Sequence, residues 1–179
     1  GGPHFGASPG PLSDAFFHGT GEDAARFVAN ECDRIGELCW SRGDVQSVLL
    51  RGHLLVEHYM ERLLSLYLRR SDKVTNARFV FAEKLVLIEA FAAIPDAPCQ
   101  AIRNLNSVRN DMVHKLDYEI ATSDIDKIGK PLGNDFTEAR TRYADSPRDL
   151  LCATLNLVFR EMVCTVFAHE TSGQERPFG

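Results

Sequence analysis

The segment VQSVLLRGHLLVEHYMERLLSLYLRR, residues 45–70, decides the fold class of this chain. Its apolar residues recur at helical spacing, and at 100° per residue they cover the helix on almost every side. They are Leu50, Leu54, Leu55, Val56, Tyr59, Met60, Leu63, Leu64, Leu66 and Leu68. A helix that is apolar all round is buried on all sides. Either this helix lies at the centre of one monomer or one side of it faces a second copy of the chain, and we favour the second arrangement.

Helical periodicity also dominates the sequence on both sides of this segment. Asp44 is a suitable N-cap for the central helix, and Ser146 followed by Pro147 predicts the start of a last helix. The long helices that we predict span residues 22–41, 44–70, 79–94, 97–116 and 146–169. The stretch before the last helix is expected to be a loop with short helical pieces, capped by Ser123 and Asn134. Because no segment alternates with period two, the sequence predicts an all-α fold, an up-and-down bundle of about five main helices.

The length of 179 residues fits one domain. We assign residues 13–170 to a single helical domain. The stretches GGPHFGASPGP at the start and TSGQERPFG at the end are rich in Gly, Pro and polar residues. We therefore expect flexible tails at residues 1–12 and 171–179.

Composition and charge argue against several function classes. The net charge of -5 and the pI near 5.7 argue against direct binding of duplex DNA. No helix-turn-helix with a basic recognition helix is evident either. Five cysteines without a CxxC pair indicate reduced thiols rather than a zinc site or a disulfide framework. No apolar run reaches the roughly 18 residues of a membrane span. We expect a cytoplasmic protein without a metal, a cofactor or a membrane partner.

The run VRNDMVHKL, residues 108–116, is the motif that suggests chemistry. It places Arg109 and Asn110 side by side, with His114 four residues further along. This pattern resembles the signature of the HEPN superfamily, the nucleotide-binding domains of higher eukaryotes and prokaryotes. FAEKLVLIEAFAAIP, followed by LNSVRNDMVH, resembles the bacterial branch that includes the mannitol operon repressor family. The resemblance is clearest over residues 79–118 and extends as helix order over roughly 44–170.

The resemblance implies a helical bundle that dimerises with two motifs facing one cleft. Active members of the superfamily are metal-independent endoribonucleases, often toxins or defence proteins, while others are noncatalytic binding or assembly modules. The sequence therefore leaves two functions open. One is a ribonuclease with RNA and an antitoxin or other regulatory protein as partners. The other is a noncatalytic dimeric transcriptional regulator or interaction module of the mannitol operon repressor type.

RNA cleavage through the 2′-hydroxyl needs a base that titrates near neutral pH and a cation for the developing charge on the phosphate. Histidine and arginine supply these properties. His114 and Arg109 are therefore the candidate catalytic residues, and Asn110 is expected to hold the phosphate or the imidazole. The charge distribution agrees with this placement, because residues 51–115 carry a net +3 although the whole chain is acidic.

Helical geometry separates the motif residues. On an ideal helix Arg109 lies within the apolar stripe, whereas a polar row follows the opposite face, formed by Arg103, Ser107, Asn110 and His114. An inward guanidinium must be paired, because it cannot release its proton. Glu57 and Glu61, four residues apart on the central helix, are the predicted partners of Arg109. On the same helix we interpret His53 and His58 as packed or interface histidines.

Overall fold

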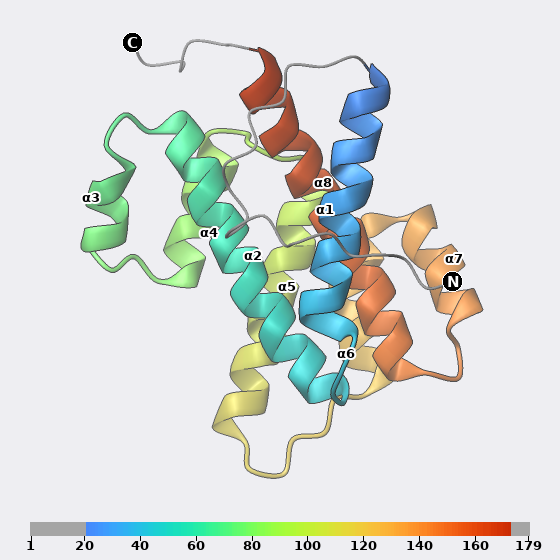
Figure 1. The fold of residues 1–179 in the computed structure, drawn as a ribbon. Helices are drawn as coiled ribbons and strands as arrows, with labels where there is room; N and C mark the ends of the chain where they lie inside the picture. Colours follow the sequence, from blue (N-terminus) through green and yellow to red (C-terminus); the bar gives the residue numbers. More distant parts are fainter. Residues whose placement is uncertain (1–20, 173–179) are drawn as a thin grey trace.

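The computed structural model describes residues 21–172, and within this range every regular element is a helix (Figure 1). The prediction of an all-α fold is therefore confirmed. The elements in chain order are α1 (Gly21–Trp40), α2 (Val45–Tyr67), α3 (Ser71–Asn76), α4 (Phe81–Ala90), α5 (Asp96–His114), α6 (Thr122–Gly129), the 3₁₀ helix η1 (Lys130–Leu132), α7 (Asn134–Arg142) and α8 (Pro147–Ser172). The expected tail at residues 1–12 lies outside the described residues, as does 173–179. Residues 171 and 172, predicted to be tail, belong to α8.

The caps of the two longest core helices are those that the sequence predicts. The Asp44 carboxylate accepts a hydrogen bond from the backbone N–H of Ser47 at 2.9 Å, at the start of α2. The Ser146 hydroxyl accepts one from the backbone N–H of Asp149 at 3.2 Å, at the start of α8. Each side chain satisfies an N–H group that the first turn of a helix leaves without an intrahelical partner.

The short helices were less well predicted. α3 was not expected at all, and Ser123 is not the cap of α6. Instead the Asp124 carboxylate accepts from the backbone N–H of Ala121 at 2.8 Å, so the residue three positions into the helix stabilises its start. Asn134 is the first residue of α7 rather than its cap, and the residue before it, Gly133, has φ +69°.

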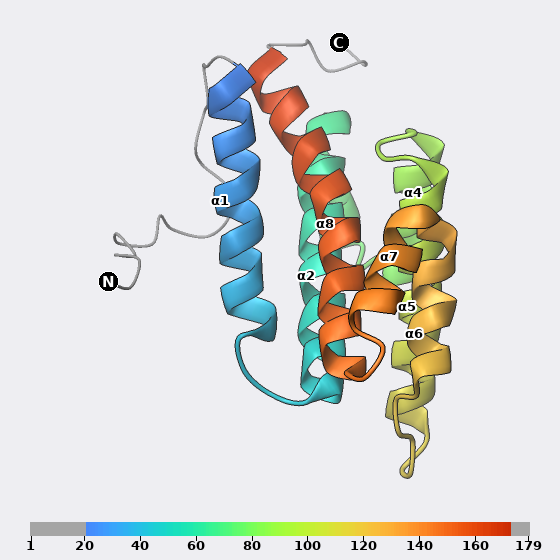
Figure 2. The ribbon, with the colours of Figure 1, turned by 90° about the vertical axis from the view of Figure 1, so that its right-hand side faces the viewer.

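The long helices form two groups. Figure 2 shows α1, α8 and α2 side by side, with α4, α5 and α6 on the other side of α2 and α8. α2 and α8 approach so closely that a Cβ atom placed on Gly52 would lie 2.5 Å from Leu155. The core fills the space between the groups with fully buried side chains, including those of Tyr59, Met60, Leu63, Ile102, Leu105 and Phe159. α2 is therefore the helix that both groups share.

The central position of α2 explains most, but not all, of its apolar character. Val56, Tyr59 and Leu63 are buried inside the monomer, as the first of the two predicted arrangements requires. Leu50 and Leu54, one turn apart, remain 38% and 66% exposed. One side of the N-terminal half of α2 therefore presents leucines at the surface, and these residues are available to a second copy of the chain.

The five cysteines all carry free thiols, in agreement with the prediction of reduced cysteines. Burial raises the pKa of Cys39, Cys99 and Cys152 to about 11, which keeps these thiols protonated. They act as small apolar side chains of the core.

α8 is the helix among residues 21–172 that has the length and apolar composition of a membrane span. Half of its most apolar window is buried inside the protein, where α8 packs on α1 and α2. A central helix of a globular core has the same properties, so this feature follows from the packing of α8.

Candidate functional site

α5 carries the Arg-Asn-x3-His motif in its last two turns. The Arg109 Nη1 atom donates to the Asn110 Oδ1 atom at 3.2 Å, and both side chains are half-buried. His114 is the last residue of the helix and is exposed. Within residues 21–172 no hydrogen bond or ion pair joins the His114 side chain to another residue. The structure thus brings two of the three motif residues together and leaves the third at the surface, one helical turn further on.

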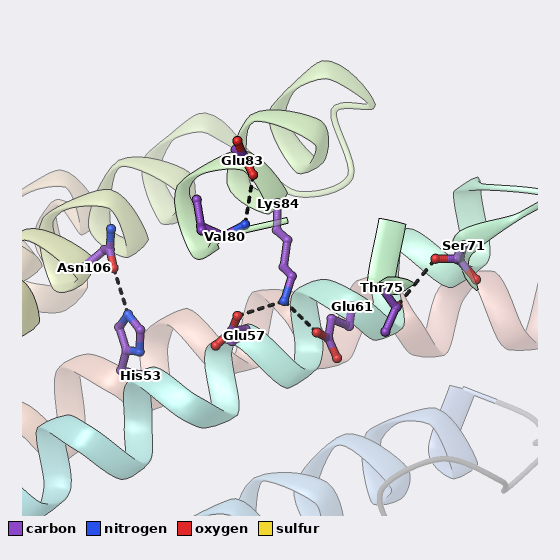
Figure 3. Close-up of polar contacts among 9 residues, drawn as sticks. All are labelled: His53, Glu57, Glu61, Ser71, Thr75, Val80, Glu83, Lys84 and Asn106. Carbon is purple, nitrogen blue, oxygen red and sulfur yellow. Dashed lines mark hydrogen bonds and ion pairs between the residues drawn. The ribbon is translucent and has the colours of Figure 1, made fainter. Parts of the chain in front are cut away.

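The predicted ion pair between Arg109 and the carboxylates of α2 is wrong. Lys84, on α4, donates to Glu57 Oε1 at 2.8 Å and to Glu61 Oε1 at 2.6 Å (Figure 3). The Lys84 side chain is only 8% exposed. Burial acts to lower the pKa of Lys84, but the hydrogen bonds to the two carboxylates outweigh it and raise the pKa above its ordinary value. These three residues form a charge-compensated group that we call the lysine cluster.

The register between α2 and α5 explains why Arg109 does not reach these carboxylates. His53 bonds to Asn106, and Gln46 bonds to the backbone carbonyl of Tyr118, so the two helices run antiparallel. Arg109 follows Asn106 on α5 and therefore lies toward the N-terminal end of α2. Glu57 lies one turn beyond His53 in the opposite direction, where α4 packs instead. α4 thus supplies the cation that sequence reasoning assigned to α5.

His53 is a buried residue near the motif, which the sequence predicted only as a packed or interface histidine. Its Nε2–H group donates to Asn106 Oδ1 at 2.9 Å, and its ring stacks on Phe81 with centroids 4.1 Å apart and planes 18° apart. The residue is 5% exposed. Burial is the main cause that lowers the pKa of His53, and the positive charge of Arg109 lowers it further, while the bond to Asn106 and the charge of Glu57 offset part of this effect. The ring is therefore neutral near pH 7.

We call His53, Asn106 and Arg109 the histidine cluster. A sequence signal for both clusters exists, because His53, Glu57 and Glu61 recur every four residues on α2 and share one face of it. Such a polar file is unusual in an otherwise apolar helix. It shows that one face of α2 meets polar partners, but it does not show which helix supplies them.

The predicted polar row on α5 is divided between different neighbours. Arg103 forms an ion pair with Glu89 of α4 and donates a hydrogen bond to the Gln100 Oε1 atom at 2.9 Å. The Ser107 hydroxyl accepts from the Lys127 Nζ atom of α6 at 2.9 Å. These two supporting residues therefore bind neighbouring helices, while Asn110 turns to Arg109.

The apolar stripe of α5 holds for most of its length and fails at the end. Ile102, Leu105 and Val108 are buried as predicted, but Val113 is 47% exposed and Leu116, beyond the end of the helix, is fully exposed. The helix continues past the body of the protein at this end (Figure 1). Exposed apolar residues therefore flank the motif.

Two cavities in the described region lie away from the motif. One of about 270 Å³ lies between α7 and α8 and continues toward a second of about 160 Å³ beside the start of α5. Both are lined by Asp135 and Arg160, which pair with each other at 3.0 Å. Because its charges compensate each other, this groove does not indicate a ligand of either sign.

Among residues 21–172, no group of three or more His, Cys, Asp or Glu side chains is arranged to hold a metal ion. Comparison with known proteins found no matching family model, no similar curated protein and no similar solved structure. The chemistry of the site must therefore be argued from its own residues.

Proposed function

We propose that this chain is a metal-independent endoribonuclease of the HEPN type that its motif resembles. Arg109 and Asn110 hold a phosphate of RNA, and His114 moves the proton of the attacking 2′-hydroxyl. The observation that supports this most is the state of Arg109. Its side chain is half-buried and bonded to a neutral amide, and the carboxylates on the facing helix are bound by Lys84. A guanidinium in such surroundings is suited to an anionic ligand.

The chemistry requires few groups. His114 in its neutral form accepts the proton of the 2′-hydroxyl, and the 2′-oxygen attacks the adjacent phosphorus. The guanidinium of Arg109 stabilises the negative charge that develops on the phosphate oxygens. The leaving 5′-oxygen takes a proton, and the products are a 2′,3′-cyclic phosphate and a free 5′-hydroxyl.

We propose that the active form is a cytoplasmic homodimer of up-and-down bundles. One motif supplies a single exposed histidine, whereas the reaction uses both a proton acceptor and a proton donor. A twofold arrangement supplies two copies of His114 to one cleft. Two groups of exposed apolar residues suit such an interface, Leu50 and Leu54 on α2, and Val113 near the end of α5 with Leu116 just beyond it. An antitoxin or other regulatory protein is the second partner that this function implies.

The same exposed apolar residues favour a second candidate, a noncatalytic dimeric regulator or interaction module of the mannitol operon repressor type. In that function the surface around Val113 and Leu116 binds protein, and Arg109 has no reacting ligand. The two candidates differ in one measurable property, which is cleavage controlled by His114.

The test incubates the purified protein with total RNA in EDTA and compares the wild type with His114→Ala. The ribonuclease predicts EDTA-resistant cleavage that leaves 2′,3′-cyclic phosphate ends and that His114→Ala abolishes. Because His114 is exposed, this variant should keep the melting temperature of the wild type. His58→Ala, another exposed histidine, is the matched control and should cleave normally. A folded wild type without such cleavage contradicts the ribonuclease and favours the regulator.

A further inference from the structure

We infer that His53 belongs to the same anion-binding site as Arg109 and takes up a proton when Arg109 binds a phosphate group. The inference rests on the proposed function, which gives Arg109 a phosphodiester ligand. It adds a second titrating residue, on a different helix from the motif, and a pH dependence of ligand binding. His53 acts here as a positioning residue that matches its charge to the ligand.

The geometry connects His53 to Arg109 through Asn106. Its ring is held between Phe81, on which it stacks, and Asn106, to which it donates at 2.9 Å. Asn106 precedes Arg109 by three residues on α5, so the two side chains lie on one face of that helix. Figure 3 shows the imidazole of His53 directed from α2 toward Asn106. Because these two contacts hold the ring, His53 can change its protonation state without changing its position.

The charges around His53 show why its protonated form needs an additional negative charge nearby. On its own helix the nearest charged group is Glu57, and that carboxylate is bound by Lys84 of α4. α5 contributes the positive charge of Arg109 and the neutral amide of Asn106. Phe81 of α4 stacks on the ring, and Leu155 of α8 lies against the adjacent Gly52. A protonated His53 would add a second positive charge beside Arg109.

A bound phosphate removes this obstacle. Its negative charge compensates Arg109, and the imidazolium form of His53 then becomes favourable. Linkage requires the reverse effect as well, so that a protonated His53 strengthens phosphate binding by the same factor. The affinity of the site for a phosphodiester should therefore rise as the pH falls through the titration of His53.

The experiment follows the imidazole signals of the folded protein by NMR between pH 5 and 8. His53 is assigned by the signal lost in His53→Gln, whose side-chain amide can still donate to Asn106. The probe is a 2′-O-methyl RNA oligonucleotide, which has phosphodiesters but no free 2′-hydroxyl and is not cleaved. We expect the probe to shift the titration of His53 to higher pH. In Arg109→Gln, His53 should titrate at higher pH than in the wild type even without the probe. Adding the probe to this variant should not move the titration further.

Binding of the same probe, measured by fluorescence anisotropy, gives the second readout. Its affinity for the wild type should increase about fivefold or more from pH 8 to pH 5.5, a typical coupling between linked sites. In His53→Gln this increase of affinity toward low pH should be lost. Asn106→Asp adds a carboxylate beside the ring. In this variant the rise of probe affinity should begin at higher pH than in the wild type. His58→Gln, at an exposed position five residues along α2, should behave as the wild type.

Three results would overturn the inference. They are a probe that does not bind, a probe that binds without moving the titration of His53, and a titration that Arg109→Gln leaves unchanged. Cleavage controlled by His114 is measured separately and decides the proposed function. Cleavage with an unresponsive His53 would refute only the inference. A responsive His53 without cleavage would refute the ribonuclease and leave the anion site in place.

Discussion

Two polar clusters lie along one face of α2, and they balance charge in opposite ways. In the lysine cluster, the ammonium of Lys84 lies between two carboxylates that it bonds at 2.8 and 2.6 Å. In the histidine cluster, the guanidinium of Arg109 and the ring of His53 have amides as their bonded partners. The first cluster contains its own counter-charges, as a structural ion group does. The second has an excess of positive charge, which is the property of a site that receives an anion.

The lysine cluster gives the largest expected effect on stability. Lys84→Ala leaves the two carboxylates of α2 without the cation that α4 supplies. Loss of one partner of a fully buried pair costs 3–5 kcal/mol, and because Glu61 is 40% exposed we expect about 2 kcal/mol here. Urea unfolding measures the change in the free energy of unfolding. Arg160→Ala, which breaks the exposed pair with Asp135, is the control and should cost below about 0.5 kcal/mol. Equal losses in the two variants would contradict the structural role of Lys84.

Asn106→Ala tests the bond that anchors His53. The variant removes the acceptor of a buried ring N–H group and leaves that group without its hydrogen-bond partner. We expect a loss of about 1–2 kcal/mol in the free energy of unfolding. Asn104→Ala, on the same helix, is the comparison, since Asn104 bonds a backbone carbonyl at an exposed position. A loss for Asn104→Ala as large as that for Asn106→Ala would mean that the His53–Asn106 bond is not special.

The lowered pKa of His53 predicts how stability depends on pH. The unfolded chain binds the proton more readily than the folded one, so stability is fully present above about pH 6.5, the ordinary pKa of histidine. It is lost as the pH falls from there to the pKa of the folded state, by about 1.4 kcal/mol for each unit of lowering. Denaturant unfolding at a series of pH values should show this decrease in the wild type and a reduced one in His53→Gln. Identical slopes in the two proteins would show that His53 does not titrate as proposed.

Arg109→Ala gives the smallest expected effect and separates the two clusters most sharply. Because no carboxylate among residues 21–172 forms an ion pair with Arg109, its loss leaves no charge without a partner. We expect a change below about 1 kcal/mol at pH 7, in contrast to Lys84→Ala. The stability lost relative to the wild type should be smaller at pH 5.5 than at pH 7, because the variant lacks the positive charge that disfavours a protonated His53. A loss of about 3 kcal/mol at pH 7 would instead support the buried ion pair of Arg109 that the sequence predicted.

The starts of the long helices α2 and α8 could be predicted because their caps depend on neighbouring residues. Asp44 and Ser146 act within three residues of their own position, and both form the predicted bonds. Exposure at the end of α5 could not be predicted in this way. Val113 continues the apolar pattern of Leu105, but the helix has passed the elements that would bury it. The pattern states which face is apolar, and not how far the neighbouring helices extend along it.

The sequence by itself determined that this chain is all-α and where its long helices run, and it proposed Glu57 and Glu61 as the partners of Arg109. Only the tertiary structure decided that the cation is Lys84 rather than Arg109, and that His53 bonds to Asn106 on the helix that carries Arg109. The physical reason is the register of packed helices. Helical periodicity specifies the face on which a side chain lies, whereas the height at which it meets another helix depends on how the whole core packs. A shift of one turn exchanges one charged partner for another, and here it leaves the Arg109 guanidinium bonded to the amide of Asn110 instead of to a carboxylate.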